Sequence, residues 1–333
     1  MLRFATILAA VLLTGFQAAP PTLPPRLAAL AEDPQAARTF DYFSLKAEGQ
    51  DLQALGETTG EWMRQRLGAD AQWAGGRCMT RAEMELRAGI DAARMAPDAA
   101  TFEADREAAD DALNRWQVFA VDIRNGAEPT GQPFQSVAQW ISEAEEATNP
   151  RAREVLGRVA NDQLYRHAYT SGGQVWGETL SEGAMSRVHA FLAREICEID
   201  ASNTAWLKSE VAADGWFRSS VEGERASRAA WLIAQHADNE PSFQNEVLRL
   251  LAPLVEAGEA NAANYAYLYD RVASGSNRPQ RYGTQGRCTA RDVWTPNDLE
   301  DPDRVEALRD EVGIGSLAEY QARMHRYCAD FTG

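Results

Sequence analysis

The stretch TRAEMELRAGIDAARM, Thr80–Met95, carries the pattern that decides the fold class. It is amphipathic and rich in alanine, and Thr80 stands three positions before Glu83. A hydroxyl and a carboxylate at this spacing form a capping box, in which the two side chains satisfy free N–H groups at the start of a helix. The stretch therefore predicts a helix over residues 81–95 with Thr80 as its N-cap.

The same signs of helix recur along the chain of 333 residues. A second alanine-rich amphipathic window covers residues 102–123, whereas alternating runs of valine, isoleucine, threonine and aromatic residues are nearly absent. Helix boundaries are predicted by capping boxes at Ser136, Ser219 and Ser316, by caps before proline at Asn149–Pro150 and Asp301–Pro302, and by glycine ends at Gly258 and Gly275. We expect a mostly α fold, an irregular multi-helix bundle made of two helical units.

The first 19 residues have the layout of a secretory signal peptide. Arg3 precedes an apolar run, Phe4–Leu13, and the small residues Ala18 and Ala19 follow it. The run is shorter than the ~20 residues of a bilayer-spanning helix, and no comparable run follows. We therefore expect a soluble periplasmic or secreted protein that does not insert into a membrane after signal removal; the alternative is a short buried N-terminal helix.

The remaining chain divides at its clearest linker, Gly126–Pro133, with the sequence GAEPTGQP. Glycine and proline at this density favour a connection over a helix. We predict an N-terminal helical unit of unknown role at residues 20–145 and a C-terminal helical domain at residues 146–333.

Four cysteines form an even set with no CxxC spacing: Cys78, Cys197, Cys288 and Cys328. In an oxidising compartment such a set favours two disulfides over a metal site. Three pairings are possible, and we prefer Cys78–Cys197 with Cys288–Cys328 because each bond then stays near one half of the chain. Free, buried thiols are the alternative.

The charge and the absent motifs exclude several classes of function. A formal net charge of −16 opposes binding to nucleic-acid phosphates and to anionic membrane surfaces, so we expect neither as a partner. The sequence has no GxSxG elbow, HExxH motif, phosphate-binding GxxxxGK[ST] loop or dinucleotide-binding GxGxxG motif. Metal content and cofactors stay undetermined, because the four histidines are far apart in the sequence.

Two helical segments place polar side chains within apolar patterns. In AAWLIAQHAD, Ala229–Asp238, the imidazole of His236 shares a helix face with aliphatic side chains and requires a partner. In NDQLYRHAY, Asp162 lies one turn before Arg166, and Gln163 lies one turn before His167.

A third group of polar residues ends a predicted helix and fills the loop after it. Asp270 and Arg271 lie near the helix end, and the hexapeptide QRYGTQ forms the loop. Its residues are Gln280, Arg281, Tyr282, Gly283, Thr284 and Gln285. Gly283 is expected to be the hinge, because glycine takes positive φ or lets a ligand approach the backbone.

These ordered motifs resemble a bacterial family known only as a domain of unknown function. The family is recognised by a glutamine–histidine helix, here Gln235 and His236, and by a QxYGTQ loop. The resemblance covers roughly residues 149–327 and implies no established activity.

The residues suggest two classes of function. In the first, the protein is an acid–base enzyme of the hydrolase type, with His236 and Asp270 as catalytic residues and a small polar or peptide-like substrate. The predicted ligand-binding residues are Asp162, Gln163, Arg166, Gln235, Arg271 and the QRYGTQ loop, where guanidinium and amide groups would hold an anionic or carbonyl group. In the second, the same pocket only binds a ligand or a protein partner. Ordinary alternatives are a core histidine held by one hydrogen bond and an Asp270–Arg281 pair that fixes the loop.

Overall fold

A computed structural model of the chain describes residues 22–68, 76–176, 179–329 and 331. Helices dominate these residues, which confirms the mostly α prediction. The predicted signal peptide lies outside the described residues. The N-terminal helices are α1 (Pro25–Leu30), α2 (Pro34–Thr39), α3 (Ser44–Ala47), α4 (Leu52–Leu67), α5 (Arg81–Met95) and α6 (Ala99–Arg124).

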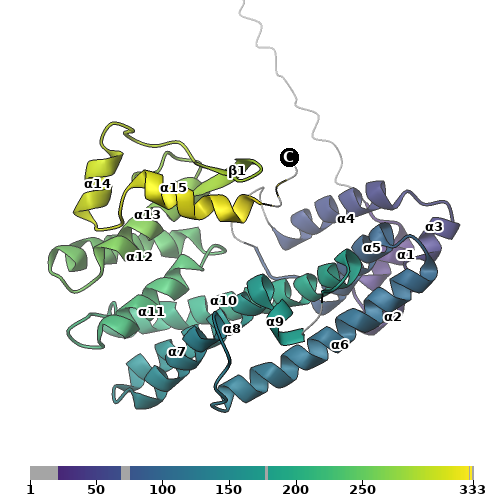
Figure 1. Ribbon diagram of the computed structural model, residues 1–333, viewed down its shortest axis with the longest axis horizontal. Helices are drawn as coiled ribbons and strands as arrows, with labels where there is room; N and C mark the ends of the chain where they lie inside the picture. Colours follow the sequence, from purple (N-terminus) through teal and green to yellow (C-terminus); the bar gives the residue numbers. More distant parts are fainter. Residues whose placement is uncertain (1–21, 69–75, 177–178, 330, 332–333) are drawn as a thin grey trace, which may run out of the picture.

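Longer helices connect the two ends of the molecule (Figure 1). The middle helices are α7 (Phe134–Glu146), α8 (Pro150–Ser171), α9 (Gly173–Trp176) and α10 (Glu182–Asp214). Helix α10 packs against α5 and α6 and also against α8 and α11, so it joins the N-terminal helices to the C-terminal ones. Among the described residues, no helix has both the length and the apolar character that a membrane crossing requires.

The C-terminal part adds five helices and one small antiparallel sheet to the described structure. They are α11 (Glu224–Gln235), α12 (Pro241–Glu256), α13 (Ala262–Gly275), β1 (Gly286–Ala290), β2 (Val293–Pro296), α14 (Val305–Glu311), α15 (Leu317–His325) and the 3-10 turn η1 (Arg326–Cys328). In the sheet, Cys288 pairs with Trp294. Figure 1 shows α13 between α12 and the layer formed by α14, α15 and β1.

Three large apolar clusters form the core. The first belongs to the N-terminal helices and contains Leu86 and Ile90. The second contains Trp116 of α6, Val137 of α7 and Leu164 of α8, and the third belongs to α7, α8 and α10–α13. Because the second cluster draws on helices from both sides of residue 145, the boundary near that residue stays a prediction.

Both predicted disulfides are present. Cys78 is bonded to Cys197, and Cys288 is bonded to Cys328. The first bond joins the segment before α5 to the middle of α10, and the second joins β1 to η1. A bond that closes a long segment of chain restricts the unfolded state more than a bond that closes a short one.

The helix boundaries test the local predictions one by one. The capping boxes at Thr80 and Ser316 are confirmed, as are the Asn149 cap and the left-handed Gly258. The box at Ser136 is wrong, because α7 already begins at Phe134.

Three further boundaries are also wrong, each because another contact is made. Glu222 accepts a hydrogen bond from the N–H of Arg218 inside a turn, and α11 begins later, at Glu224. Asp301 accepts from the N–H of Asp303 in a turn, so that α14 begins only at Val305. Gly275 is still helical, and the left-handed residue after α13 is Asn277.

Candidate functional site

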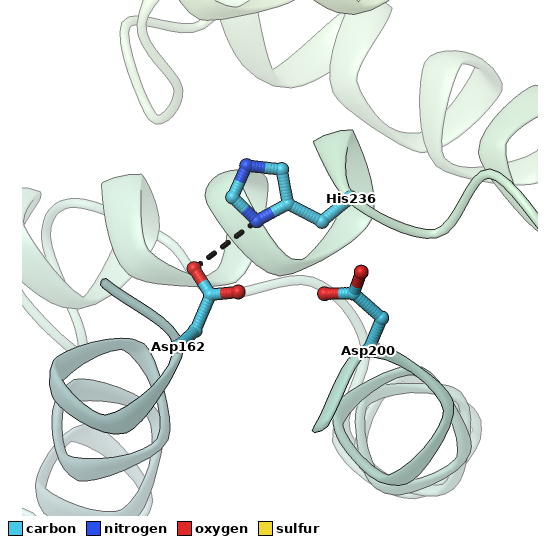
Figure 2. A group of neighbouring side chains, drawn as sticks. All are labelled: Asp162, Asp200 and His236. Carbon is cyan, nitrogen blue, oxygen red and sulfur yellow. Dashed lines mark ion pairs between the residues drawn. The ribbon is translucent and has the colours of Figure 1, made fainter. Parts of the chain in front are cut away.

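Three helices bring together the most unusual polar cluster of the described residues. Asp162 lies on α8, Asp200 lies on α10, and His236 is the C-cap residue of α11. The apolar face of α11, which includes the buried Ile233, packs into the core and so positions the ring that follows it. Figure 2 shows the imidazole of His236 above the two carboxylates, each of which comes from a different helix. We call these three residues the Asp–Asp–His cluster.

The closest contact in the cluster joins the imidazole to Asp162. The Nδ1 atom of His236 lies 3.1 Å from Oδ2 of Asp162, whose side chain is only 3% exposed. The contact has the distance of an ion pair, but it lacks the alignment of a regular hydrogen bond, and Nδ1 is buried with no such partner among the described residues. The other ring nitrogen lies on the side of the ring that faces away from the carboxylates (Figure 2).

Arg166 holds both carboxylates in place. Its Nε donates to Oδ1 of Asp162 at 2.8 Å, which confirms the expected contact one turn along α8. Its Nη2 donates to both oxygens of Asp200, at 2.6 and 2.7 Å. The predicted ligand-binding residue Gln163 also points here, because its Nε2 donates to Oδ2 of Asp162 at 2.7 Å. The guanidinium of Arg166 therefore bridges the two carboxylates of the Asp–Asp–His cluster.

The two carboxyl groups have different affinities for a proton. Burial on its own would raise the pKa of Asp162, but the charge and close contact of His236, together with the charge and hydrogen bond of Arg166, outweigh it and hold the pKa well below its ordinary range. Burial raises the pKa of Asp200 to about 6, with the charge of Asp162 acting in the same direction and Arg166 and His236 opposing it. Asp162 is thus the permanent anion of the pair, and Asp200 is the carboxyl group that titrates near neutral pH.

We expect replacement of Asp200 by asparagine to change the pH dependence of stability. Because the pKa of Asp200 rises from 3.8 to about 6 on folding, the native state binds the proton more tightly than the unfolded state. Its contribution to stability is present below pH 4 and is lost as pH rises through 6. Between pH 4 and pH 7 the wild type should lose up to about 3 kcal/mol more than Asp200→Asn.

Urea unfolding of both proteins at several pH values, in metal-free buffer, measures this difference. Glu198→Gln, on the same helix, is the control and should follow the wild type. Parallel curves for wild type and Asp200→Asn would contradict the raised pKa.

The cluster lies beside a cavity of about 340 Å³. Asp200 and His236 line it directly, and the N-terminal segment contributes Arg77 and Cys78 on another side. Asn239 also lines the cavity, and its Nδ2 lies 3.7 Å from the sulfur of Cys197. The Cys78–Cys197 disulfide therefore fixes the N-terminal segment beside the imidazole.

The expected pairing of His236 with Asp270 is wrong. Asp270 is fully buried and accepts hydrogen bonds from three backbone N–H groups of the loop, those of Arg281, Tyr282 and Thr284, at 2.8–3.2 Å. No residue of the QRYGTQ loop lines the cavity beside His236. The physical reason is that the loop must satisfy its own buried N–H groups, and the Asp270 carboxylate is the acceptor at hand.

The loop residues are engaged with one another and with neighbouring segments. Gln280 donates to the carbonyl oxygens of Gln285 and Asn297, and its own Oε1 accepts from the N–H of Gln285. Arg281 contacts Glu300 and the hydroxyl of Tyr269. The side chain of Gln285 donates to the hydroxyl of Thr284. These contacts support a structural role for the hexapeptide.

Gly283 has the predicted positive φ, at +70°. A Cβ at this position would lie 2.8 Å from a methyl carbon of Leu317, which would have to move, and the positive φ itself favours glycine. The approach that was expected from a ligand is made by α15 instead. Tyr282 packs in a small apolar cluster with Ala266 and Ile314.

Two more of the predicted ligand-binding residues, Arg271 and Gln235, lie at or near the end of α11. Arg271 donates to Asp238, two residues after His236, and so connects α13 to the end of α11. Gln235 is buried, and its Oε1 has no hydrogen-bond partner among the described residues.

Sequence reasoning missed Asp200. Its helix carries many acidic residues, so a further aspartate attracts no attention. The one available signal was its place about one turn after Cys197, on the part of α10 that the disulfide brings to the N-terminal segment.

Comparison with known proteins identifies a family without assigning a reaction. Residues 161–328 match DUF6624, a family of unknown function. No curated protein and no solved structure matches the chain. The matched region begins one residue before Asp162 and contains the whole Asp–Asp–His cluster, whereas the cavity residues Arg77 and Cys78 lie outside it.

Proposed function

The chain belongs to DUF6624, a family of unknown function, and from its site we propose that it is an exported acid–base enzyme of the hydrolase type. The substrate class is a small polar or peptide-like molecule. The observation that carries this proposal is the contact with Asp162 that His236 makes at the wall of the cavity. An imidazole beside a buried carboxylate is suited to general-base chemistry, because the carboxylate orients the ring and stabilises the charge that the ring acquires.

The cluster has the groups that a hydrolytic step requires. His236 takes a proton from a water molecule while the water oxygen forms a bond to the acyl carbon of the substrate. The negative charge of Asp162 stabilises the imidazolium ion that results. Asp200, whose pKa is raised to about 6, is a suitable donor of the proton that the leaving group takes when its bond to carbon breaks.

The cavity supports the proposed substrate class. Its volume of about 340 Å³ is at the small end of the roughly 300–1,000 Å³ that ligand pockets occupy. Arg77, Glu198, Asn239 and Glu240 line it together with Asp200 and His236, so charged and amide groups are available to a ligand. Such walls favour a ligand with amide, hydroxyl or charged groups over an apolar one.

The proposal of export is supported by the two disulfides and by the N-terminal sequence. Disulfides persist in oxidising compartments and are rare in the cytosol. Arg3 and the apolar run after it have the order of a cleaved signal. These two features together support a periplasmic or extracellular location.

Replacement of His236 by glutamine is expected to remove turnover while the protein stays folded. A positioned general base contributes about 10²–10⁴-fold to the rate, so the loss should be at least about 100-fold. Small polar compounds and cell-wall peptides would be screened with the wild type by thermal shift, and product formation would be followed by mass spectrometry.

His189→Gln is the matched control, because His189 is stacked on the ring of Tyr169 and does not line this cavity. It should keep wild-type turnover. Ligand binding without turnover in the wild type would identify a binding protein rather than an enzyme. A His236→Gln protein that is unstable yet unchanged in ligand binding and turnover would show a histidine with a purely structural role.

A further inference from the structure

The Asp–Asp–His cluster has the composition and spacing of a metal site. One oxygen of Asp162, one oxygen of Asp200 and Nδ1 of His236 all lie within 4.8 Å of one another. Ligand atoms about 2.1 Å from a shared ion are separated by up to about 4.2 Å, so small side-chain rotations bring all three onto one ion. One imidazole nitrogen and two carboxylate oxygens are donors that first-row divalent ions accept.

The buried nitrogen of His236 is the second observation. Nδ1 faces the two carboxylates in Figure 2, yet it makes no regular hydrogen bond among the described residues. A neutral ring in this orientation with its lone pair on Nδ1 would place that lone pair against negative oxygens. A cation between the ring and the carboxylates would accept this lone pair and would also be attracted by the negative oxygens.

The charges of the cluster favour a cation as well. When both carboxyl groups are ionised and His236 is neutral, they and the guanidinium of Arg166 carry one net negative charge in a buried place, which is costly unless it is paired. Arg166 contacts both carboxylates, and Gln163 contacts Asp162. Groups that hydrogen-bond to metal ligands orient them and tune the affinity of the site for its metal.

From these observations we infer that Asp162, Asp200 and His236 bind one first-row divalent cation of the Zn²⁺ or Mn²⁺ type. Imidazole is a poor ligand for Ca²⁺ and Mg²⁺, which prefer oxygen, so those ions should bind more weakly. The inference rests on the proposed hydrolytic function and changes one role in it. With the ion bound, His236 would be a ligand instead of the general base, and the ion would lower the pKa of a bound water that supplies the nucleophile. Substrate would reach the ion through the cavity that Asp200 and His236 line.

Zn²⁺ titration of the chelator-treated full chain by calorimetry tests the inference. At pH 7 we expect one equivalent to bind, with Ca²⁺ as the comparison ion. Loss of a group that only hydrogen-bonds to a metal ligand lowers the affinity for the metal about 10–100-fold. Loss of a ligand itself, in His236→Gln or Asp200→Asn, should therefore lower the affinity for Zn²⁺ at least about 100-fold. Glu198→Gln is the control, because it removes one negative charge from the same cavity as Asp200→Asn does but changes no proposed ligand. It should bind Zn²⁺ as the wild type does.

A second measurement does not depend on any variant folding. In ¹⁵N NMR spectra of the wild-type histidine rings, Zn²⁺ should shift the Nδ1 signal of His236 and leave that of His189 unchanged. Absence of this shift, or Zn²⁺ binding that persists in both cluster variants, would overturn the metal site.

The outcomes separate the two proposals. A wild type that binds no Zn²⁺ but loses turnover in His236→Gln would overturn the metal site and leave the acid–base enzyme standing. A wild type that binds Zn²⁺ through His236 and turns over nothing would support the metal site and overturn the enzyme.

Discussion

Replacing both Cys78 and Cys197 with serine is expected to lower the free energy of unfolding by about 5 kcal/mol. The bond joins residues 119 positions apart, and its removal gives the unfolded chain back the conformations that this closure excludes. The site should suffer as well, because the bond fixes the N-terminal segment beside the cavity. Urea unfolding measures the stability, and hydrogen exchange at residues 76–80 reports the local effect.

The second disulfide is the matched control. Cys288 and Cys328 are 40 positions apart, so their replacement should cost less, about 4 kcal/mol, and should leave exchange at residues 76–80 unchanged. Equal exchange near the cavity in both double variants would show that the Cys78–Cys197 bond does not hold that segment in place.

Replacing Asp270 with alanine should lower the free energy of unfolding by about 4 kcal/mol, because each buried donor left without a partner costs about 1–3 kcal/mol. Three backbone N–H groups, those of Arg281, Tyr282 and Thr284, would lose their acceptor. Burial raises the pKa of Asp270, because it disfavours the ionised carboxylate. The hydrogen bonds from the loop act in the opposite direction and stabilise the ionised form.

Asp298→Ala is the control for this change. Asp298 is exposed, and it is its backbone carbonyl that accepts from the N–H of Gln280, so the substitution keeps that contact. The free energy of unfolding of Asp298→Ala should equal that of the wild type. Wild-type stability in Asp270→Ala would mean that the loop finds other acceptors and that the carboxylate is not its support. Turnover by a folded Asp270→Ala protein would agree with the structural role of this residue.

Much of the fold follows from short-range chemistry that a sequence displays. The helix over residues 81–95 has the predicted bounds, because Thr80 and Glu83 satisfy the first free N–H groups within one turn. Predictions failed where a side chain found a partner outside the expected helix. Glu222, for example, bonds to the N–H of Arg218 in a turn, and it also pairs with Arg151 on α8.

The candidate site depended on contacts that no local pattern displays. His236 was identified because an imidazole within an apolar pattern needs a partner, but the partner was chosen from the wrong helix. Asp270 and Asp162 are both polar residues in apolar helices, and only the packing of α8, α10 and α11 selects Asp162. The polar loop was misinterpreted for a related reason: side chains that satisfy a buried backbone resemble, in sequence, side chains that hold a ligand.

Part of the cavity wall lies outside the region that matches the family. Arg77 and Cys78 precede the matched region by more than eighty positions, yet they line the same cavity as His236. A fragment that starts at residue 161 would keep Asp162, Asp200 and His236 but would lose the part of the cavity wall that residues 76–78 form. Exchanging residues 76–78 should therefore alter which molecules enter the cavity, while the contact between Asp162 and His236 is left as it is.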